Sequence, residues 1–371
     1  MAKTADVIII GGGIAGVSAA AQLSQYCSVL ILEKEQTTGY HATGRSAAAF
    51  APAYGNEVVR NLTAASESFY KSPPDGFTEA PLLKTRDSVF IAGHNQKHSL
   101  ATMLAESEHL TQLTSDELVQ RVPLLDGTHI HGGAIDCTSG DLDVDAILQG
   151  FLRQFRVNGG EVICDAEVQR IDWRDKVWNL ATNNGEYSAP TLVNAAGAWA
   201  DGVAELAGIS PLSIQPFRRS ALLVDAPKNM QINDWPLIID VDENFYFKPE
   251  AGQLLISPAD ETPFEPCDAY PDDIDLAIAI DKVQQISHLE VAKINHSWAG
   301  LRTFARDKTF VLGYEPNHKG FFWLAGQGGY GVQSAPALAD ITCHLICGSS
   351  NIITEEYREK HLSDISPERF R

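Results

Sequence analysis

The chain has 371 residues, 44% of them hydrophobic, which is typical of a globular protein of about two domains. With 28 Lys and Arg against 48 Asp and Glu, its formal net charge is −20, which disfavours nucleic acid and anionic membranes as partners. No run of about 18 apolar residues occurs, so we expect no integral membrane segment. The chain opens without a secretory signal pattern, and its six cysteines show no CxxC spacing, so we expect a cytoplasmic protein with reduced thiols.

The first 35 residues predict a βαβ unit. The β-branched run at residues 7–10 is typical of a strand buried on both faces of a parallel sheet, and glycines follow it directly. Residues 14–23 are rich in alanine and predict a helix that can pack closely on the sheet. Residues 28–32 predict the second strand, and the crossover between the two strands should be right-handed.

The rest of the chain divides into regions of different pattern. Asp145 is a candidate N-cap for a helix over residues 146–158, and residues 191–195 predict a further small strand. From residue 214 to residue 256 the apolar alternation indicates an antiparallel sheet. Helices are expected at 57–70, 101–108, 199–206, 273–289 and 332–347, and further strands at 88–92, 161–171, 177–181 and 321–325.

Gly11, Gly13 and Gly16 match the pattern G-x-G-x-x-G, which indicates a dinucleotide site at the start of a helix. Gly11 permits the tight turn, Gly13 lets the backbone approach a pyrophosphate, and Gly16 allows close packing of helix on strand. Glu33 ends the second predicted strand, where a carboxylate accepts ribose hydroxyl groups and disfavours a 2′-phosphate. This motif serves FAD and NAD equally well.

Three later segments resemble the FAD-contacting segments of the glycine/D-amino acid oxidase family of FAD-dependent oxidoreductases. They are residues 40–48 (YHATGRSAA), 193–199 (VNAAGAW) and 322–331 (FWLAGQGGYG). Within that family the resemblance is closest to the bacterial FAD-dependent D-arginine dehydrogenases, and it includes residues 215–220 (QPFRRS) and 298–302 (WAGLR). The resemblance covers nearly the whole chain.

The resemblance implies non-covalent FAD and a discontinuous FAD-binding domain. We expect an α/β fold in which a Rossmann-like domain (1–78, 143–212 and 300–371) is interrupted by a mainly antiparallel substrate domain (79–142 and 213–299). The residues expected to contact FAD are Gly11, Gly13, Ile14, Ala15, Gly16, Glu33, Lys34, Thr43, Gly44, Arg45, Ser46, Ala48, Val168, Ala196, Gly197, Trp199, Gly328, Gly329, Tyr330, Gly331 and Gln333.

The expected substrate site contains two arginines and two tyrosines. An arginine fork binds both oxygens of a carboxylate, and the resemblance assigns this task to Arg219 and Arg302, with Arg218 as the alternative if the strand register differs. Tyr54 and Tyr246 resemble the active-site tyrosines of the family. Residues 49–54 would then form a mobile loop over the substrate.

Three positions depart from the D-arginine dehydrogenases. Ser88 stands where we align a glutamate that binds the guanidinium of the substrate, and Ala49 and Ala51 replace a histidine and a threonine. Asp87 is adjacent to Ser88, but neighbouring side chains of a strand face opposite ways. We therefore expect a preference for neutral or apolar amino acids, D-configured, or related amines, and poor use of arginine and lysine.

The expected reaction is transfer of the Cα hydride of an amine to the flavin, which gives an imine that hydrolyses to the 2-oxo acid and ammonia. The sequence leaves open whether a quinone or O₂ takes the electrons. The alternatives are oxidation of a 2-hydroxy acid or a secondary amine, an NAD-linked oxidoreductase, and a non-catalytic flavin-binding module.

Two further clusters resemble metal sites and are interpreted as structural. Asp141, Asp143 and Asp145 begin like a calcium loop but lack its glycine and its terminal glutamate, so a turn and a helix cap are expected. Cys343 and Cys347 lie with a histidine on one predicted helix, but no second ligand cluster accompanies them.

Overall fold

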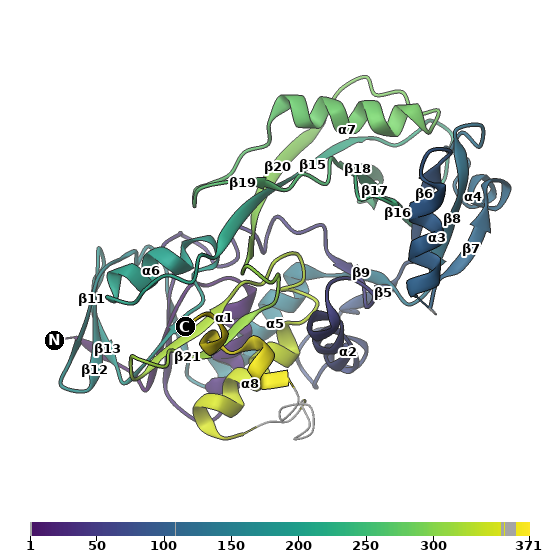
Figure 1. Cartoon of the computed structure of the whole chain (residues 1–371). Coiled ribbons are helices and arrows are strands. Elements are labelled where there is room, and N and C mark those ends of the chain that lie inside the picture. The colour runs from purple at the N-terminus through teal and green to yellow at the C-terminus, as the bar shows by residue number, and fades with distance from the viewer. Residues whose placement is uncertain (1, 108, 350–351, 353–360) are drawn as a thin grey trace.

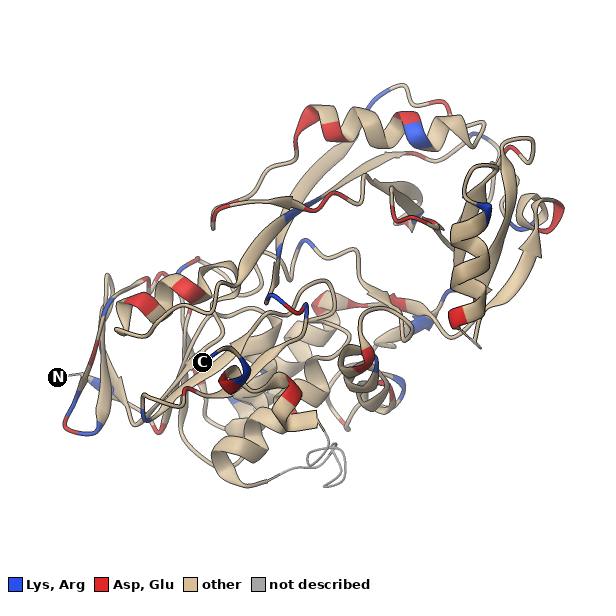
Figure 2. Ribbon diagram, in the orientation of Figure 1, with Lys and Arg blue, Asp and Glu red and all other residues tan. Residues whose placement is uncertain are grey.

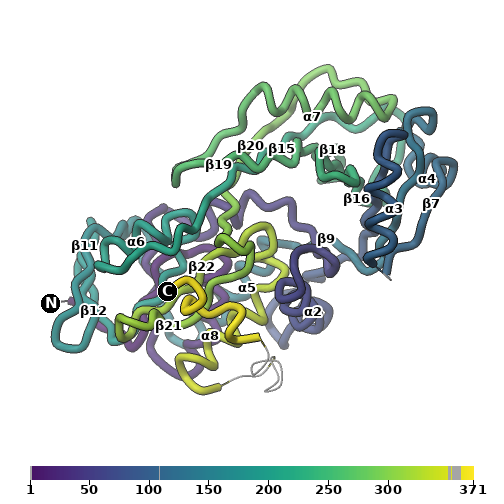
Figure 3. The backbone as a smooth tube through the Cα atoms, in the orientation of Figure 1, coloured from purple at the N-terminus to yellow at the C-terminus, as the bar shows by residue number. Residues whose placement is uncertain are grey.

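The computed structural model describes residues 2–107, 109–349, 352 and 361–371. Within these residues the chain forms four β-sheets with helices packed around them, arranged in a lower and an upper part in Figure 1. The first and the last segments of the chain both lie in the lower part, and the long strands β15 (Gln215–Asp225) and β20 (His296–Phe304) run from there into the upper part (Figure 3).

A six-stranded sheet forms the centre of the lower part, and the predicted N-terminal strand lies inside it. Its neighbouring strands are parallel except at β21, which is antiparallel to β22. The strands in spatial order are β10 (Glu161–Ile163), β3 (Val29–Leu32), β2 (Val7–Ile10), β14 (Thr191–Asn194), β22 (Phe321–Ala325) and β21 (Val311–Tyr314).

Four helices cover one face of this sheet. Fully buried alanines such as Ala19 and Ala20 let the first helix lie close to the strands. The helices are α1 (Ile14–Leu23), α2 (Glu57–Lys71), α5 (Val144–Val157) and α8 (Ala335–Cys347). Helix α5 begins two residues earlier than predicted, because the Asp143 side chain, not Asp145, accepts the Ala146 N–H as N-cap.

A smaller sheet packs on the opposite face around the buried Trp178. It contains β1 (Lys3–Thr4), β13 (Gly185–Ala189), β12 (Val177–Thr182) and β11 (Val168–Arg174), and the helical segments η1 (Gly197–Trp199) and α6 (Ala200–Leu206) lie beside it. The single strand predicted over residues 161–171 is therefore wrong: it is divided into β10 and β11, which belong to different sheets.

A nine-stranded sheet builds the upper part, and the pairs in it are antiparallel except for β16 with β6. In spatial order it contains β19 (Thr262–Pro263), β15, β18 (Gln253–Ser257), β17 (Tyr246–Glu250), β16 (Leu237–Asp240), β6 (Ser88–Gly93), β8 (Ile130–Asp136) and β7 (Thr111–Thr114), with β20 paired to β15. The predicted antiparallel region is thus confirmed, and the mixed α/β architecture with two main sheets agrees with the expected fold class.

Three helices pack on the nine-stranded sheet. Helices α4 (Ser115–Arg121) and α7 (Asp273–Gln285) share the core with Val89 and Ile91 on one face, whereas α3 (Lys97–Glu106) packs against Ala92 on the other. The predicted end of α3 at residue 108 lies outside the described residues. A three-stranded sheet of β4 (Ala49–Phe50), β9 (Gly140–Leu142) and β5 (Leu83–Thr85) lies between the two parts, and η2 (Pro367–Phe370) lies near the C-terminus.

The predicted domain boundary between residues 299 and 300 falls inside β20, and parts of the terminal segments lie outside the described residues, so the domain division stays a prediction. Asp and Glu residues occur along the ribbon in both parts of the molecule (Figure 2). In the portion of the chain that the structure describes, no helix has the length and apolarity needed to span a bilayer.

Candidate functional site

The glycine turn after β2 is built by close contacts that exclude side chains. Gly11 has a φ of +110°, and a Cβ there would lie 2.3 Å from the carbonyl oxygen of Ala195. A Cβ at Gly16 would lie 2.0 Å from the carbonyl oxygen of Gly11. These two glycines therefore let strand β14 and helix α1 approach the turn, as the motif predicts.

Glu33 organises this turn from the end of β3. It is 8% exposed, and its carboxylate accepts the N–H of Gly12 at 2.7 Å and the N–H of Glu35 at 2.9 Å. Thr43 contributes its Oγ1, which accepts the N–H of Ile14 at 3.0 Å in the first turn of α1. The carboxylate also lines the cavity beside the turn, where further lone pairs remain for a ligand hydroxyl.

A cavity of about 400 Å³ extends along the carboxyl ends of the strands. Sixteen of the residues predicted to bind FAD line it: Gly11, Gly13, Ile14, Ala15, Glu33, Lys34, Thr43, Arg45, Ser46, Val168, Ala196, Gly197, Trp199, Gly328, Gly329 and Gly331. Gly16 and Gly44 act in packing, since a Cβ at Gly44 would lie 2.7 Å from the carbonyl oxygen of Gly39. The other three, Ala48, Tyr330 and Gln333, line a second, larger cavity.

One end of the smaller cavity is aromatic and apolar. The Lys34 ammonium lies 3.4 Å from the centroid of the Trp199 ring, and Val168 closes the same end. Helix α6 adds Gly202 and Val203 to the lining, which the sequence analysis did not include. The sequence pattern of these two residues is that of any buried helix face, so it did not predict that they line a ligand cavity.

Arg45 joins this cavity to the nine-stranded sheet. Its guanidinium donates to the carbonyl oxygens of Ala269 (3.0 Å) and Ala299 (2.9 Å) and pairs with Asp268 at 2.5 Å. The hydrogen bond from Arg45 lowers the pKa of Asp268. Arg45 therefore makes an ion pair while it lines the cavity, and its predicted contact with FAD stays a prediction.

The register of β15 and β20 places Arg219 and Arg302 on one face of the sheet. Phe217 lies opposite Arg302 and Arg219 lies opposite Gly300, so the two arginine side chains emerge on the same side. Arg218 emerges on the other side and pairs with Asp260 at 3.4 Å and Asp275 at 2.6 Å. The alternative assignment to Arg218 therefore has no support in the geometry.

The two arginines differ in their surroundings. Among the described residues no carboxylate lies within ion-pairing distance of Arg302, whereas Arg219 contacts Glu261 at 3.2 Å. Burial lowers the pKa of Arg302, but Tyr246, Tyr54 and two glutamates outweigh it, so the net shift is upward. Burial and the positive charge of Arg302 lower the pKa of Arg219, whose buried Nε also lacks a partner in the described part of the chain.

The second cavity, of about 1840 Å³, meets the first at the arginines. Arg219, Arg302 and Tyr246 line both cavities, while Tyr54, Ser88, Ala49 and Ala51 line the larger one. Asp87, adjacent to Ser88, instead lies 3.9 Å from Arg121 in an exposed ion pair and is not among the lining residues. The structure thus brings together every residue that was predicted for the substrate site.

The segment predicted as a mobile loop is partly anchored. Ala49 and Phe50 pair with β9, and the Gln333 amide accepts the N–H of Ala51 at 2.9 Å. The Gln333 side chain also donates to Thr63 at 3.0 Å, so its predicted contact with FAD stays a prediction.

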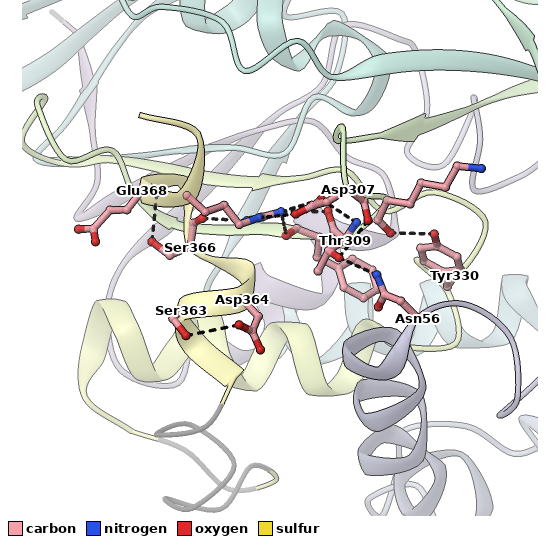
Figure 4. A network of polar contacts seen from close by, with 11 residues as sticks. Asn56, Asp307, Thr309, Tyr330, Ser363, Asp364, Ser366 and Glu368 are labelled. Atoms are coloured by element: carbon pink, nitrogen blue, oxygen red, sulfur yellow. Dashed lines mark hydrogen bonds and ion pairs between the residues drawn. The ribbon is translucent and has the colours of Figure 1, made fainter.

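The end of this loop packs against residues near the arginines. The ring of Tyr54 packs edge-on against Tyr330 at 5.5 Å. Figure 4 shows Asn56 pointing to Thr309, to which its side chain donates at 2.6 Å. Tyr330 points to the segment just before Thr309, where its hydroxyl donates to the Lys308 carbonyl at 2.9 Å. Residues 52–53 lie between the anchors at Ala51 and Tyr54.

Lys248 and Glu261 are lining residues that the sequence analysis did not identify. Lys248 is 2% exposed and pairs with Asp141 at 2.9 Å and Glu250 at 3.0 Å. The alternation of β17, which places Lys248 on the same face as Tyr246, was the available signal for the lysine. No local pattern marked Glu261, which follows β18 in an irregular segment.

The two clusters interpreted as structural have structural partners. Asp141 pairs with Lys248 and with Arg86, and Asp143 caps α5. The sulfur of Cys347 lies 3.9 Å from that of Cys27, and burial together with these neighbouring thiols raises the pKa of Cys27 to about 12.

Comparison with known proteins decides the family. The DAO family model, described as FAD dependent oxidoreductase, matches residues 6–345. The chain belongs to the DAO family of FAD-dependent oxidoreductases.

Individual DAO-family relatives are distant. FAD-dependent oxidoreductase domain-containing protein 1 of Bos taurus is 22% identical over 404 residues, 93% of this chain and 81% of that protein. L-2-hydroxyglutarate dehydrogenase of Escherichia coli strain K12 is 27% identical over 253 residues, 61% of this chain and 56% of that protein. The crystal structure of glycine oxidase from Geobacillus kaustophilus superposes with a TM-score of 0.81 at 20% identity, covering 96% of this chain and 98% of that one.

DAO-family membership makes FAD the cofactor, and the described residues fit it. Because Gly11 and Gly13 carry no side chain, room remains for a pyrophosphate at the start of α1. The Glu33 carboxylate can accept hydrogen bonds from ribose hydroxyls. Gly328, Gly329 and Gly331 also line the cavity, and Gly329 lies against Arg302. The buried Nε2 of Gln327, which lines this cavity, has no partner in the described part of the chain and is available to a bound ring.

Proposed function

We propose that this enzyme oxidises the Cα–N bond of an amino acid, D-configured, or of a related amine. At the family level, FAD-dependent oxidation of amino acids and amines agrees with the DAO match and with the glycine oxidase structure. The observation that carries the proposal is the position of Arg219 and Arg302. They emerge on one face of β15 and β20, where the cofactor cavity meets the larger cavity, and Arg302 has no anionic partner within the described residues. A buried guanidinium without a counter-ion is stabilised by a carboxylate ligand.

The protein groups bind and orient the substrate. The fork of Arg302 holds the substrate carboxylate, Arg219 adds a second cation, and the hydroxyls of Tyr54 and Tyr246 donate to its oxygens. The aromatic pair of Tyr54 and Tyr330 excludes water from the side of the loop. When bound, FAD supplies the acceptor for the Cα hydride, and the resulting imine hydrolyses to the 2-oxo acid and ammonia.

No protein base is required once the bound amine has lost its proton, because the nitrogen lone pair then assists departure of the hydride. We propose that activity rises with pH through the ionisation of the substrate amine. A rate that stays constant across that range would contradict this mechanism.

The proposed substrate preference differs from that of the D-arginine dehydrogenases. The resemblance to those enzymes otherwise includes Arg219, Arg302, Tyr54 and Tyr246. Ser88 is 3% exposed and lines the larger cavity, so it supplies no charge to a guanidinium. Apolar side chains such as Phe90, Leu237 and Ile239 line the same region. We therefore propose neutral or apolar side chains for the substrate, a quinone or O₂ as electron acceptor, and a cytoplasmic location, which suits the six free cysteines.

Oxidation of a 2-hydroxy acid is the second candidate, because it needs the same carboxylate clamp. The similarity to L-2-hydroxyglutarate dehydrogenase favours it.

Anaerobic titration of the purified yellow protein tests both candidates. The flavin absorbance should be bleached by neutral D-amino acids or amines. Bleaching by 2-hydroxy acids alone would establish the second candidate in place of the first. A flavin that none of these compounds reduces would overturn both.

A further inference from the structure

Within the described residues, Glu261 is the carboxylate that pairs with one of the two arginines of the proposed clamp. Its Oε1 lies 3.2 Å from Nη2 of Arg219, and its Oε2 lies 3.5 Å from Nζ of Lys308. The Arg219 side chain is 10% exposed, whereas those of Glu261 and Lys308 are 37% and 62% exposed. Glu261 thus contacts Arg219 from its more solvent-exposed side, and the proposed function assigns Glu261 no role.

The backbone of Glu261 is held while its side chain faces the cavity. The preceding residue, Asp260, accepts the N–H of Ser220 at 2.6 Å and its hydroxyl at 2.9 Å, and pairs with Arg218. The following residues, Thr262 and Pro263, pair with β15. The Glu261 side chain can therefore leave Arg219 by a change of rotamer alone, with Lys308 as its remaining partner.

The negative charge of Glu261 acts on both Arg219 and Arg302. Burial and the neighbouring Arg302 lower the pKa of Arg219, and Glu261 opposes that shift. Glu261 also counts, after the two tyrosines, among the charges that raise the pKa of Arg302. An anion bound between the arginines lies beside the negative charge of Glu261, and it competes with this carboxylate wherever it contacts Nη2 of Arg219.

We propose that Glu261 makes the site selective for amino acids over 2-hydroxy acids and simple carboxylates. This inference rests on the proposed function, because it takes Arg219 and Arg302 as the carboxylate clamp. An amino acid brings an amino group, protonated in solution, that compensates the charge of Glu261. A 2-hydroxy acid or an unsubstituted carboxylate brings only negative charge and meets the full repulsion.

Three ligands of one shape test this selectivity without turnover. 2-Aminoisobutyrate, 2-hydroxyisobutyrate and isobutyrate share a branched carboxylate and carry no oxidisable hydrogen on an amine- or alcohol-bearing carbon. Isothermal titration of the holoenzyme gives their dissociation constants. For Glu261→Gln we expect 2-hydroxyisobutyrate and isobutyrate to bind at least about threefold more tightly, and 2-aminoisobutyrate to bind equally or less tightly.

Two further variants separate the causes. Lys308→Met removes the alternative partner of Glu261 and should weaken the binding of isobutyrate. Glu106→Gln is the matched control, because Glu106 lines the same cavity but makes no ion pair with either arginine in the described structure. We expect it to change the ratio of the amino to the hydroxy ligand by less than about twofold.

The outcomes distinguish this inference from the proposed function. If Arg302→Met abolishes binding of all three ligands but Glu261→Gln leaves their ratios unchanged, the clamp stands and the role of Glu261 is wrong. If Arg302→Met leaves binding unchanged, the proposed function itself fails. Thermal unfolding and flavin content of each variant report whether it folds, and Lys308→Met keeps the inference testable should Glu261→Gln not fold.

Discussion

The backbone of Gly329 lies directly against the guanidinium of Arg302. A Cβ at this position would be 2.9 Å from Nη1 and 3.0 Å from Cζ of the arginine. The glycine segment predicted to contact FAD and the arginine predicted to hold the substrate therefore share one contact. A larger residue at 329 would displace the guanidinium, so the absence of a side chain there serves the arginine as well as the cofactor.

Arg302→Met should lower kcat/KM for the best amino acid by at least about a hundredfold, because it removes the cation that we propose holds the substrate carboxylate. Steady-state kinetics measures the loss. Arg306→Met is the matched control, since Arg306 also lines the larger cavity but donates to Ser213 at 3.0 Å. A comparable loss in the control would show that any positive charge in the cavity suffices.

Gly16→Ala should disrupt the nucleotide turn, because the added methyl group would lie 2.0 Å from the carbonyl oxygen of Gly11. We expect the free energy of unfolding to fall by about 1–3 kcal/mol, with loss of bound FAD. Denaturant unfolding of the apoprotein and the flavin absorbance of the purified protein measure these effects. Gly202→Ala on α6 is the control for folding, since a Cβ there has no neighbour within 4 Å. Equal stability of the Gly16→Ala protein would contradict the packing argument.

Asp268→Asn should destabilise the protein at neutral pH and have little effect in acid. The hydrogen bond from Arg45 lowers the pKa of Asp268 below its ordinary value of 3.8. A carboxyl group with a lowered folded-state pKa stabilises the fold above the unfolded-state pKa and loses that contribution as the pH falls through the folded-state pKa.

Thermal unfolding at a series of pH values checks this dependence. The difference in Tm between the two proteins should be largest near pH 7 and should shrink below about pH 4. A difference that is independent of pH would mean that the ion pair contributes nothing.

Ser88→Glu should raise kcat/KM for D-arginine by about tenfold, because it would place a carboxylate where we align the guanidinium contact of the D-arginine dehydrogenases. Ser88 is 3% exposed and lies opposite the buried Asp136 across β6 and β8, so the two carboxylates would repel each other and a cationic substrate group would relieve that repulsion. Ser88→Gln matches the size without the charge. Substrate panels for the three proteins measure the effect, and an equal gain for the glutamine variant would assign it to shape.

The nucleotide-binding end was predictable because its signals are local. A buried strand, a glycine turn, an alanine-rich helix and a terminal acid lie within the first 35 residues, and strand and helix periodicity decide their arrangement. Local signals were less decisive for helix α5, whose N-cap was predicted two residues too late. Asp143 and Asp145 have the same cap chemistry, and in the fold the Asp143 side chain caps the helix.

The substrate end depended on tertiary structure. The sequence by itself identified Arg219, Arg302, Tyr54 and Tyr246 only through the family resemblance, and it kept Arg218 as the alternative to Arg219 if the strand register differed. The register of β15 against β20 made that choice, because one residue of shift moves a side chain to the opposite face of the sheet. The pairing of Arg219 with Glu261, like that of Gln333 with Ala51, joins segments far apart in the chain, and no local periodicity encodes such a contact.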